Sequence, residues 1–387
     1  MIVIVLAFHA SLAYLASTPA ASSAFDQAPY TWQAFPIVDA QRWLGLDLFC
    51  AWQDVSLMSL MFLLSGLFVA GSLLRKGSGT YVSDRLWRIG LPFLLAIVFL
   101  SPLSYYTAYL VRTADPSLAG FWKQWISLPS WPSGPQWFLW QLLAANALGA
   151  SLYAVAPGFV VRLGRLAAWA GERPLRFFAL LTAASALAYV PLALAFSPWS
   201  WSALGPFSLQ LSRPAHYLVY FFAGCALGCH GVDRGVLAYD GPLARNWLAW
   251  LAAALASFMV WAGFTSMTMP SWSNAAIIAQ LAASLAFPVA CAAGGLFMLS
   301  LCLRFAASLR LWILDSLSAN AYSMYLVHYV FVVWLQYALL DSGLFAFTKA
   351  AIVFTGALTM SWAISATFRF TTVPHVLAAK RAISSAA

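Results

Sequence analysis

Charged residues are scarce in this chain. Asp, Glu, Lys and Arg make up 8% of its 387 residues, against about 25% in an average soluble domain. Hydrophobic types make up 63%, and the mean hydropathy is +0.81. A chain of this length has too little polar surface to cover a fold in water. The composition therefore excludes a soluble globular enzyme and a disordered chain, and it indicates a polytopic membrane protein.

The five cysteines do not form a disulfide framework. Four of them, Cys225, Cys229, Cys291 and Cys302, lie in long apolar runs, where a thiol behaves as a small hydrophobic side chain. This pattern excludes a small secreted disulfide scaffold. Cys225 and Cys229 precede His230, but no acidic or further His residue lies nearby, so we expect no metal site. The chain also lacks a phosphate-binding loop and a dinucleotide-binding fingerprint.

Long apolar runs are abundant instead. A bilayer core needs roughly twenty apolar residues per helix, and continuous rather than alternating hydrophobicity favours helices over a β-barrel. The fold class is therefore an all-α polytopic membrane protein with about ten transmembrane helices. We expect them near residues 1–17, 54–74, 88–111, 136–156, 175–195, 214–231, 246–264, 276–303, 320–340 and 345–368.

The basic residues indicate the orientation. With ten spans both termini lie on one side, and the loops of that side hold fifteen of the twenty Lys and Arg residues. The opposite side holds Arg42, Arg112, Lys123, Arg213 and Lys349. Because cytoplasmic loops are enriched in Lys and Arg, we expect both termini to face the cytoplasm. The basic residues are spread over every inner loop, which fits topology and anionic lipid and argues against a nucleic-acid partner.

We expect one integral membrane domain over residues 1–372 and a short cytoplasmic tail over 373–387. The longest loops, 18–53 and 112–135, lie on the outer side. Their aromatic residues suit the membrane interface or stacking on sugar rings. The first span starts at Met1 without a basic flank, so we expect that further residues precede Met1. A cleaved signal peptide is the alternative interpretation.

Ionisable residues inside the predicted spans are the first candidates for function, because each is costly to place in lipid. His9 lies in the first span and His328 in the ninth. Either one has a structural alternative as a neutral donor that bridges two helices. Imidazole exchanges a proton near neutral pH, so both residues are also candidates for acid–base chemistry.

Arg85 and Arg88 stand at the start of the third span. A spacing of three places both guanidinium groups on one face of a regular helix. Paired Arg side chains suit phosphate recognition, and the alternative is that they only anchor the helix at the membrane surface.

Small residues interrupt two of the apolar spans. Ser65 and Gly66 form a notch that lets another helix or a ligand approach closely. Gly224 and Gly228 form a GxxxG pattern, which we interpret as helix packing.

Several short segments together resemble membrane acyltransferase family 3, the family of sugar O-acyltransferases. Within it, the closest resemblance is to the branch of glucan biosynthesis protein C, which is associated with succinyl transfer. The segments follow the family's order along nearly the whole chain. They are the Phe8-His9 pair, the Ser-Gly motif in Phe62 to Phe68, the RxxR motif of Arg85 and Arg88 followed by Leu91-Pro-Phe93, the segment Gly134 to Leu139, the segment His216 to Gly224, and the segment Ser318 to His328.

The resemblance implies an O-acyltransferase. It would move an acetyl or succinyl group from cytoplasmic acyl-CoA to a hydroxyl of a glycan or glycolipid outside a bacterial-type inner membrane. A thioester is already activated, so we expect no metal and no tightly bound cofactor. The implied roles are a general base for His9, acyl-CoA binding for Arg85, Arg88, Ser65 and Gly66, and lining or support of the cavity for Trp137, Tyr325 and His328.

One departure from the family pattern concerns the first span. The family carries an Arg eleven positions before the His, and that position lies before Met1 of this chain. The missing Arg keeps an inactive membrane scaffold open as an alternative. A transporter or flippase of a lipid-linked saccharide is a second, independent alternative. We find no internal repeat that would favour the transporter. A succinyl donor would need an extra cation, for which Arg42 and Arg213 are candidates, and a homo-oligomer stays open.

Overall fold

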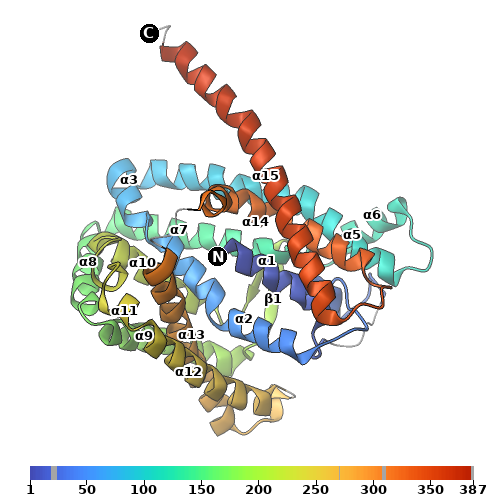
Figure 1. Ribbon diagram of the computed structural model, residues 1–387, viewed down its shortest axis with the longest axis horizontal. Coiled ribbons are helices and arrows are strands. Elements are labelled where there is room, and N and C mark those ends of the chain that lie inside the picture. Colours follow the sequence, from blue (N-terminus) through green and yellow to red (C-terminus); the bar gives the residue numbers. More distant parts are fainter. Residues whose placement is uncertain (19–23, 270, 307–310, 385–387) are drawn as a thin grey trace. The chain divides into compact units, whose positions relative to one another are not determined.

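The computed structural model describes residues 1–18, 24–269, 271–306 and 311–384, with side chains described as far as Phe368. Arg310 and the side chains of Arg369, His375, Lys380 and Arg381 lie outside the described residues. The described chain is nearly all helical, as predicted, with one short β-hairpin (Figure 1). It divides into two compact units, which we describe separately.

The first unit comprises Met1–Cys50, Leu94–Gln136 and Arg310–Ala387. Its helices α1, α14 and α15 pack on one another, and α14 also packs on α5. Its elements are α1 (Ile2–Ser11), η1 (Leu12–Tyr14), η2 (Thr31–Gln33), the start of α2 (Leu44–Gly66), η4 (Ala96–Leu100), α5 (Ser101–Arg112), α6 (Leu118–Ser127), η5 (Gly134–Gln136), α14 (Trp312–Ala338) and α15 (Ala346–Ser384).

The second unit comprises Ala51–Phe93 and Trp137–Leu309. Here α12 packs on α13, α9 on α13, α8 on α10 and α3 on α7. Its elements are the rest of α2, α3 (Val69–Arg85), η3 (Leu86–Gly90), α4 (Leu91–Leu95), α7 (Trp137–Val155), α8 (Gly158–Gly171), α9 (Pro174–Phe196), β1 (Trp201–Leu204), β2 (Phe207–Gln210), α10 (Pro214–His230), η6 (Gly235–Leu237), α11 (Pro242–Arg245), α12 (Trp247–Thr268), η7 (Trp272–Asn274) and α13 (Ile277–Phe305).

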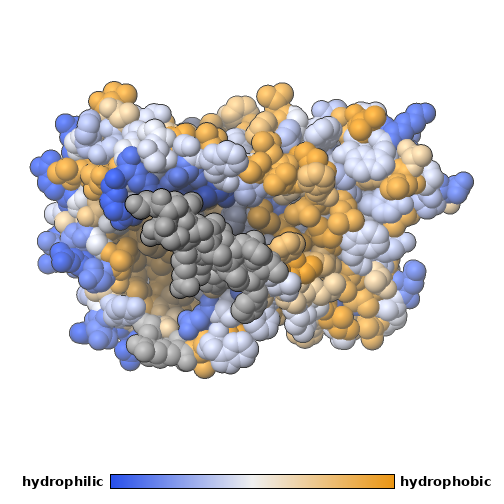
Figure 2. Space-filling model, turned by 90° about the horizontal axis from the view of Figure 1, so that it is seen from above, coloured by the Kyte–Doolittle hydropathy of each residue, from blue (hydrophilic) through white to orange (hydrophobic). Residues whose placement is uncertain are grey.

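Within the described residues, seven helical segments are long and apolar enough to cross a membrane. They are Leu44–Gly66, Val69–Arg112, Gly134–Val155, Pro174–Phe196, Trp247–Thr268, Ile277–Phe305 and Ala346–Phe368. Apolar side chains cover broad areas of the face seen in Figure 2, and Leu187 and Ile278 are about four-fifths exposed, at 81% and 78%. This surface suits a lipid solvent. The chain is therefore a multi-pass membrane protein.

The other three predicted spans correspond to helices outside this set. The first predicted span contains the apolar helix Ile2–Tyr14, which is shorter than the seven membrane-crossing segments. The sixth, α10, has 17 residues. The ninth, α14, has 27 residues and carries Asp315, Asn320 and His328 along its length. Ten spans and the orientation of the termini therefore stay predictions.

The predicted second span, 54–74, had the wrong boundaries. Helix α2 begins at Leu44 and ends at Gly66, and α3 begins at Val69. The sequence analysis treated Asp47 as part of a loop, but its carboxylate accepts hydrogen bonds from the backbone N–H groups of Ala16 and Ser17, at 2.7 and 2.9 Å. A carboxylate with such partners can stand in the first turn of a helix, where it also complements the helix dipole.

The third predicted span, 88–111, is part of a longer helical run from Val69 to Arg112. Gly77, with a positive φ of 73°, kinks this run, and two π-helical turns, Leu86–Gly90 and Ala96–Leu100, interrupt its α-helical geometry further along. Pro92 and Pro102 follow these turns at short range and cannot donate a backbone hydrogen bond, so the helix widens locally near them.

The outer loop predicted over 112–135 contains a helix, α6. Its residue Trp125 is buried in an aromatic cluster with Phe25, Trp32 and Tyr105, while Trp122 is exposed. Trp125 is therefore part of a core, whereas Trp122 and Trp131 are exposed, and stacking on sugar rings stays a prediction.

Helices α2 and α10 approach each other at glycines, as the GxxxG pattern predicted. A Cβ on Gly224 would lie 1.9 Å from the carbonyl oxygen of Leu63, and one on Gly228 would lie 1.9 Å from that of Leu67. Neither backbone can move aside without separating the helices. Gly is therefore required at both positions.

We expect Gly224→Ala to destabilise the protein by about 1–3 kcal/mol, because the new methyl group overpacks the contact with α2. The thermal midpoint of the purified protein in detergent measures this. Gly263→Ala is the matched control: Gly263 also lies in a helix, but nothing stands within 4 Å of its Cβ position. The control should keep or raise the midpoint, and equal midpoints for both variants would contradict the packing account.

Candidate active site

His9 lies near the end of α1 and is partly exposed. Its Nδ1 atom is 2.9 Å from the carbonyl oxygen of Val5, one turn earlier in the same helix. His328 lies in the middle of α14 and is completely buried. Its Nδ1 atom is 2.7 Å from the carbonyl oxygen of Tyr325.

The two histidines form a pair. Nε2 of His328 is 3.2 Å from Nδ1 of His9, and the ring centroids are 5.1 Å apart. The amide of Gln336 on α14 also donates a hydrogen bond of 3.0 Å to the backbone carbonyl of His9. Helix α14 therefore holds His9 through both its ring and its backbone. Two residues chosen from the sequence, 319 positions apart, thus meet in the structure.

The turn Gly134–Gln136 packs against α14 beside this pair. The Tyr325 hydroxyl donates a hydrogen bond to the Pro135 carbonyl, and the Gln136 amide donates one of 2.9 Å to the Leu326 carbonyl. Gly134 has a positive φ of 50°, and a Cβ there would lie 3.2 Å from the ring of Tyr329. The role predicted for Tyr325, to line or support a cavity, stays a prediction.

A buried ion pair holds the chain that follows α1. Nζ of Lys349 on α15 lies 2.7 Å from the carboxylate of Asp39, and both side chains are fully buried. The backbone N–H of Asp39 donates to the carbonyl of Ala13, which lies one turn beyond His9. Lys349 is therefore a structural cation in addition to any role in topology.

Arg85 and Arg88 lie in the second unit. Arg85 is half-buried, with its guanidinium 4.9 Å from the ring centre of Tyr81, and Arg88 is exposed. The π-turn Leu86–Gly90 begins directly after Arg85 and contains Arg88. The prediction that both guanidinium groups share one face assumed a regular α-helix, and the wider turn changes their relative direction.

Gly66, also in the second unit, faces α10. A Cβ on Gly66 would lie 2.1 Å from the carbonyl oxygen of Phe221. Of the two uses predicted for the Ser65-Gly66 notch, the approach of a helix is the one observed at Gly66. The hydroxyl of Ser65 donates to the carbonyl of Met61 in its own helix.

Trp137 opens α7, where its ring stacks on Tyr217 at a centroid distance of 5.9 Å. The neighbouring Trp201 meets Trp137 edge-on. The role of Trp137 in the cavity stays a prediction.

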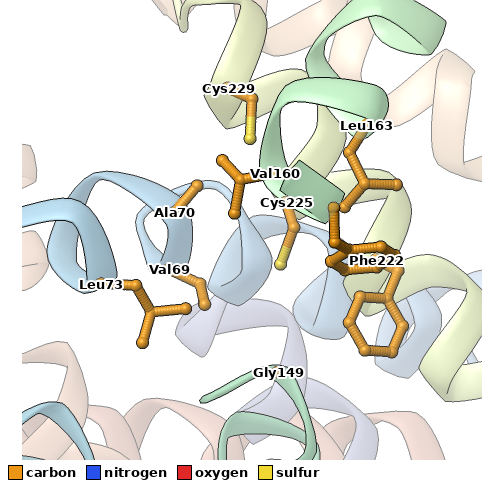
Figure 3. A pocket seen from close by; sticks show the side chains of 10 residues that line it. Val69, Ala70, Leu73, Gly149, Val160, Leu163, Phe222, Cys225 and Cys229 are labelled. Carbon is orange, nitrogen blue, oxygen red and sulfur yellow. The ribbon is translucent and has the colours of Figure 1, made fainter. Parts of the chain in front are cut away.

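A small apolar pocket lies between α3, α7, α8 and α10 (Figure 3). Cys225 and Cys229 line it together with aliphatic and aromatic side chains such as Val69, Leu163 and Phe222. Within the described chain, no group of three or more His, Cys, Asp or Glu residues could hold a metal ion. The apolar lining of this pocket is typical of a packing defect between helices.

The sequence analysis missed two polar networks in the second unit. His216 is fully buried and hydrogen-bonded to the hydroxyls of Ser185, at 2.6 Å, and Ser59, at 2.9 Å. The guanidinium of Arg213 pairs with the carboxylate of Asp54 at 2.9 Å. Polar residues inside apolar runs were the available signal, but their partners were not readable from one sequence.

The two cations considered for a succinyl carboxylate both have partners. Arg213 is paired with Asp54. Arg42 donates hydrogen bonds to the backbone carbonyls of Thr18, at 2.7 Å, and Asp39, at 3.1 Å. Neither guanidinium is therefore a free cation for an acyl substituent.

Apolar helices and a histidine pair held by main-chain carbonyls define a multi-pass helical membrane protein with acid–base groups inside one unit. Comparison with protein families gives the particular class: the sequence model of the acyltransferase domain of acyltransferase family 3 matches residues 1–366. The chain belongs to acyltransferase family 3 and is a membrane acyltransferase. No curated protein sequence and no solved structure matches it.

We expect Lys349→Met to destabilise the protein by about 3–5 kcal/mol, because it leaves the Asp39 carboxylate buried without its counter-charge. Thermal unfolding in detergent measures the loss. The double variant Lys349→Met/Asp39→Asn should recover part of it. The exposed pair of Arg176 and Glu172 is the control, and Arg176→Met should cost less than about 1 kcal/mol. A Lys349 variant as stable as the Arg176 variant would contradict the structural role of the buried pair.

Proposed function

We propose that this acyltransferase moves an acetyl or succinyl group from acyl-CoA in the cytoplasm to a hydroxyl of a glycan or glycolipid outside the cytoplasmic membrane. The observation that carries the proposal is the His9–His328 pair, which places two imidazoles in contact inside a helical unit of a family 3 acyltransferase. Imidazole is the side chain that best takes and returns a proton near neutral pH.

His9 is the general base in this proposal. A hydroxyl becomes a good nucleophile only as its proton is removed, and the thioester of acyl-CoA needs no further activation. His9 would take the hydroxyl proton while the oxygen attacks the thioester carbonyl. The alternative is a transient acyl-histidine, in which the same residue attacks first.

Arg85 and Arg88 bind the phosphates of coenzyme A in this proposal. Arg88 is exposed, and Arg85 is held over Tyr81. Guanidinium groups hydrogen-bond phosphate oxygens in a fixed geometry, which Lys does not. Succinyl as the acyl group, and a glucan as the acceptor, follow only from the resemblance to the glucan biosynthesis branch, since Arg42 and Arg213 both have protein partners.

We expect His9→Ala to lower kcat by about 10²–10⁴-fold, the usual contribution of a positioned general base. The assay follows radiolabelled acetyl-CoA or succinyl-CoA and an oligosaccharide acceptor with the purified protein in lipid nanodiscs. His230→Ala is the control for loss of an imidazole outside the pair and should keep its activity. Full activity of His9→Ala would exclude the residue as base and as nucleophile.

We expect the double variant Arg85→Ala/Arg88→Ala to weaken acyl-CoA binding by at least about tenfold, because charge-assisted hydrogen bonds to phosphate are lost. The rise in KM for acyl-CoA measures this. Arg234→Ala removes an exposed Arg with only a long contact, 4.0 Å, to Asp233 and is the matched control. Equal KM values for the double variant and the control would show that the Arg pair does not bind acyl-CoA and only anchors the helix at the membrane surface.

The transporter alternative makes a different prediction for the same preparation. A flippase would move a lipid-linked saccharide across the nanodisc or vesicle membrane without consuming acyl-CoA. An inactive scaffold would show neither activity, and acyl-CoA would not raise its thermal midpoint, because a ligand stabilises only the protein that binds it.

A further inference from the structure

The positions of protons on the two histidines follow from the groups around them. The carbonyl oxygen of Tyr325 can only accept a hydrogen bond, and it lies 2.7 Å from Nδ1 of His328. That nitrogen therefore carries a proton. In the neutral ring the other nitrogen, Nε2, then has a free electron pair.

The same argument applies to His9. Its Nδ1 atom faces two acceptors, the Val5 carbonyl at 2.9 Å and the free electron pair of His328 Nε2 at 3.2 Å. Nδ1 of His9 therefore carries a proton and shares it between them. The electron pair of the neutral His9 ring is left on Nε2, which makes no hydrogen bond with any other described residue.

We propose that His328 is a positioning residue, which together with the Val5 carbonyl holds His9 in the tautomer whose Nε2 atom accepts the proton of the acceptor hydroxyl. The proposal rests on the proposed function of His9. It identifies the atom that accepts the proton, because only one of the four ring nitrogens is available to a substrate. Without the two carbonyl oxygens and His328, both tautomers of His9 would be populated.

The step balances as follows. The hydroxyl proton moves to Nε2 of His9 as the hydroxyl oxygen forms a bond to the acyl carbon. The carbon–sulfur bond of the thioester then breaks, and its electron pair leaves on sulfur. The thiolate takes the proton from Nε2, which regenerates neutral His9 and gives the ester and free coenzyme A.

His328 also contributes while His9 carries the extra proton. The hydrogen bond from Nδ1 of His9 to Nε2 of His328 then has a charged donor, and such bonds are about twice as strong as neutral ones. The surroundings are apolar, since Ala10, Val332 and Ala346 belong to one buried cluster beside the pair. An apolar environment strengthens this hydrogen bond, which offsets part of the cost of a charged ring away from water.

A purely structural role is the competing explanation, since the pair also joins α1 to α14. The two roles differ in which substitutions they tolerate. Gln at position 328 can present an amide oxygen to Nδ1 of His9, whereas Leu fills the space without an acceptor. A structural role through packing is served equally well by either side chain.

We expect His328→Leu to lower kcat by about 10- to 100-fold, as for loss of a hydrogen bond to a charged group, with KM for acyl-CoA within about twofold of the original. His328→Gln should recover most of kcat. Equal losses in both variants, or loss of folding in both, would favour the structural role and overturn the proposal for the reaction.

A second measurement needs no activity and no variant of His328. In ¹⁵N NMR spectra of histidine-labelled protein, signals missing from His9→Gln belong to His9. We expect a protonated Nδ1 and an unprotonated Nε2. A protonated Nε2 in neutral His9 would overturn the tautomer assignment even if His9 is the base. An inactive protein with the expected tautomer would instead contradict the proposed function alone.

Discussion

The hydrogen bond between His9 and His328 is the interaction on which the proposed chemistry of the first unit depends. Each imidazole has one nitrogen directed at a main-chain carbonyl of its own helix, at 2.9 and 2.7 Å, and the remaining contact joins the two rings. Polar groups among apolar side chains are stable only with such partners. The arrangement gives three of the four ring nitrogens a partner, and the fourth, Nε2 of His9, has none among the described residues.

The surrounding structure positions this pair from several directions. Gln336 fixes the backbone of His9, and the buried pair of Asp39 and Lys349 ties the following chain to α15. Beside the pair, Gly134 lets the turn of Gly134–Gln136 approach α14 closely enough for Tyr325 to bond Pro135. The proposed proton transfer needs side chains held within a few tenths of an ångström, and these polar contacts would provide that support.

The sequence was sufficient for the fold class and for most helices, because hydrophobicity over twenty residues is a strong signal. The sequence was insufficient to predict helix boundaries where acidic side chains lie within a helix. Asp47 looks like a loop residue until its partners, the backbone N–H groups of Ala16 and Ser17, are known. It also could not foresee that α3 to α5 form one run with two π-turns.

For the candidate site, too, the sequence predicted some features and could not predict others. The sequence selected His9, His328 and Tyr325 one by one as costly or motif residues, and no rule of spacing relates positions 9 and 328. Their contact depends on the packing of α1 against α14. Gln336 and Lys349 were overlooked as site residues because one polar residue in an apolar run does not reveal its partner. The family match over residues 1–366 supports acyl transfer as the reaction type. Experiments are needed to identify the donor and the acceptor.

The most direct test of the account is a single measurement on the unmodified protein in nanodiscs. Labelled acyl-CoA and an oligosaccharide acceptor are supplied together, and free coenzyme A and acylated saccharide are quantified. The account predicts that both products appear in equal amounts and only when protein, donor and acceptor are all present. Release of coenzyme A that does not depend on the acceptor, or no release at all while a lipid-linked saccharide crosses the membrane, would contradict it.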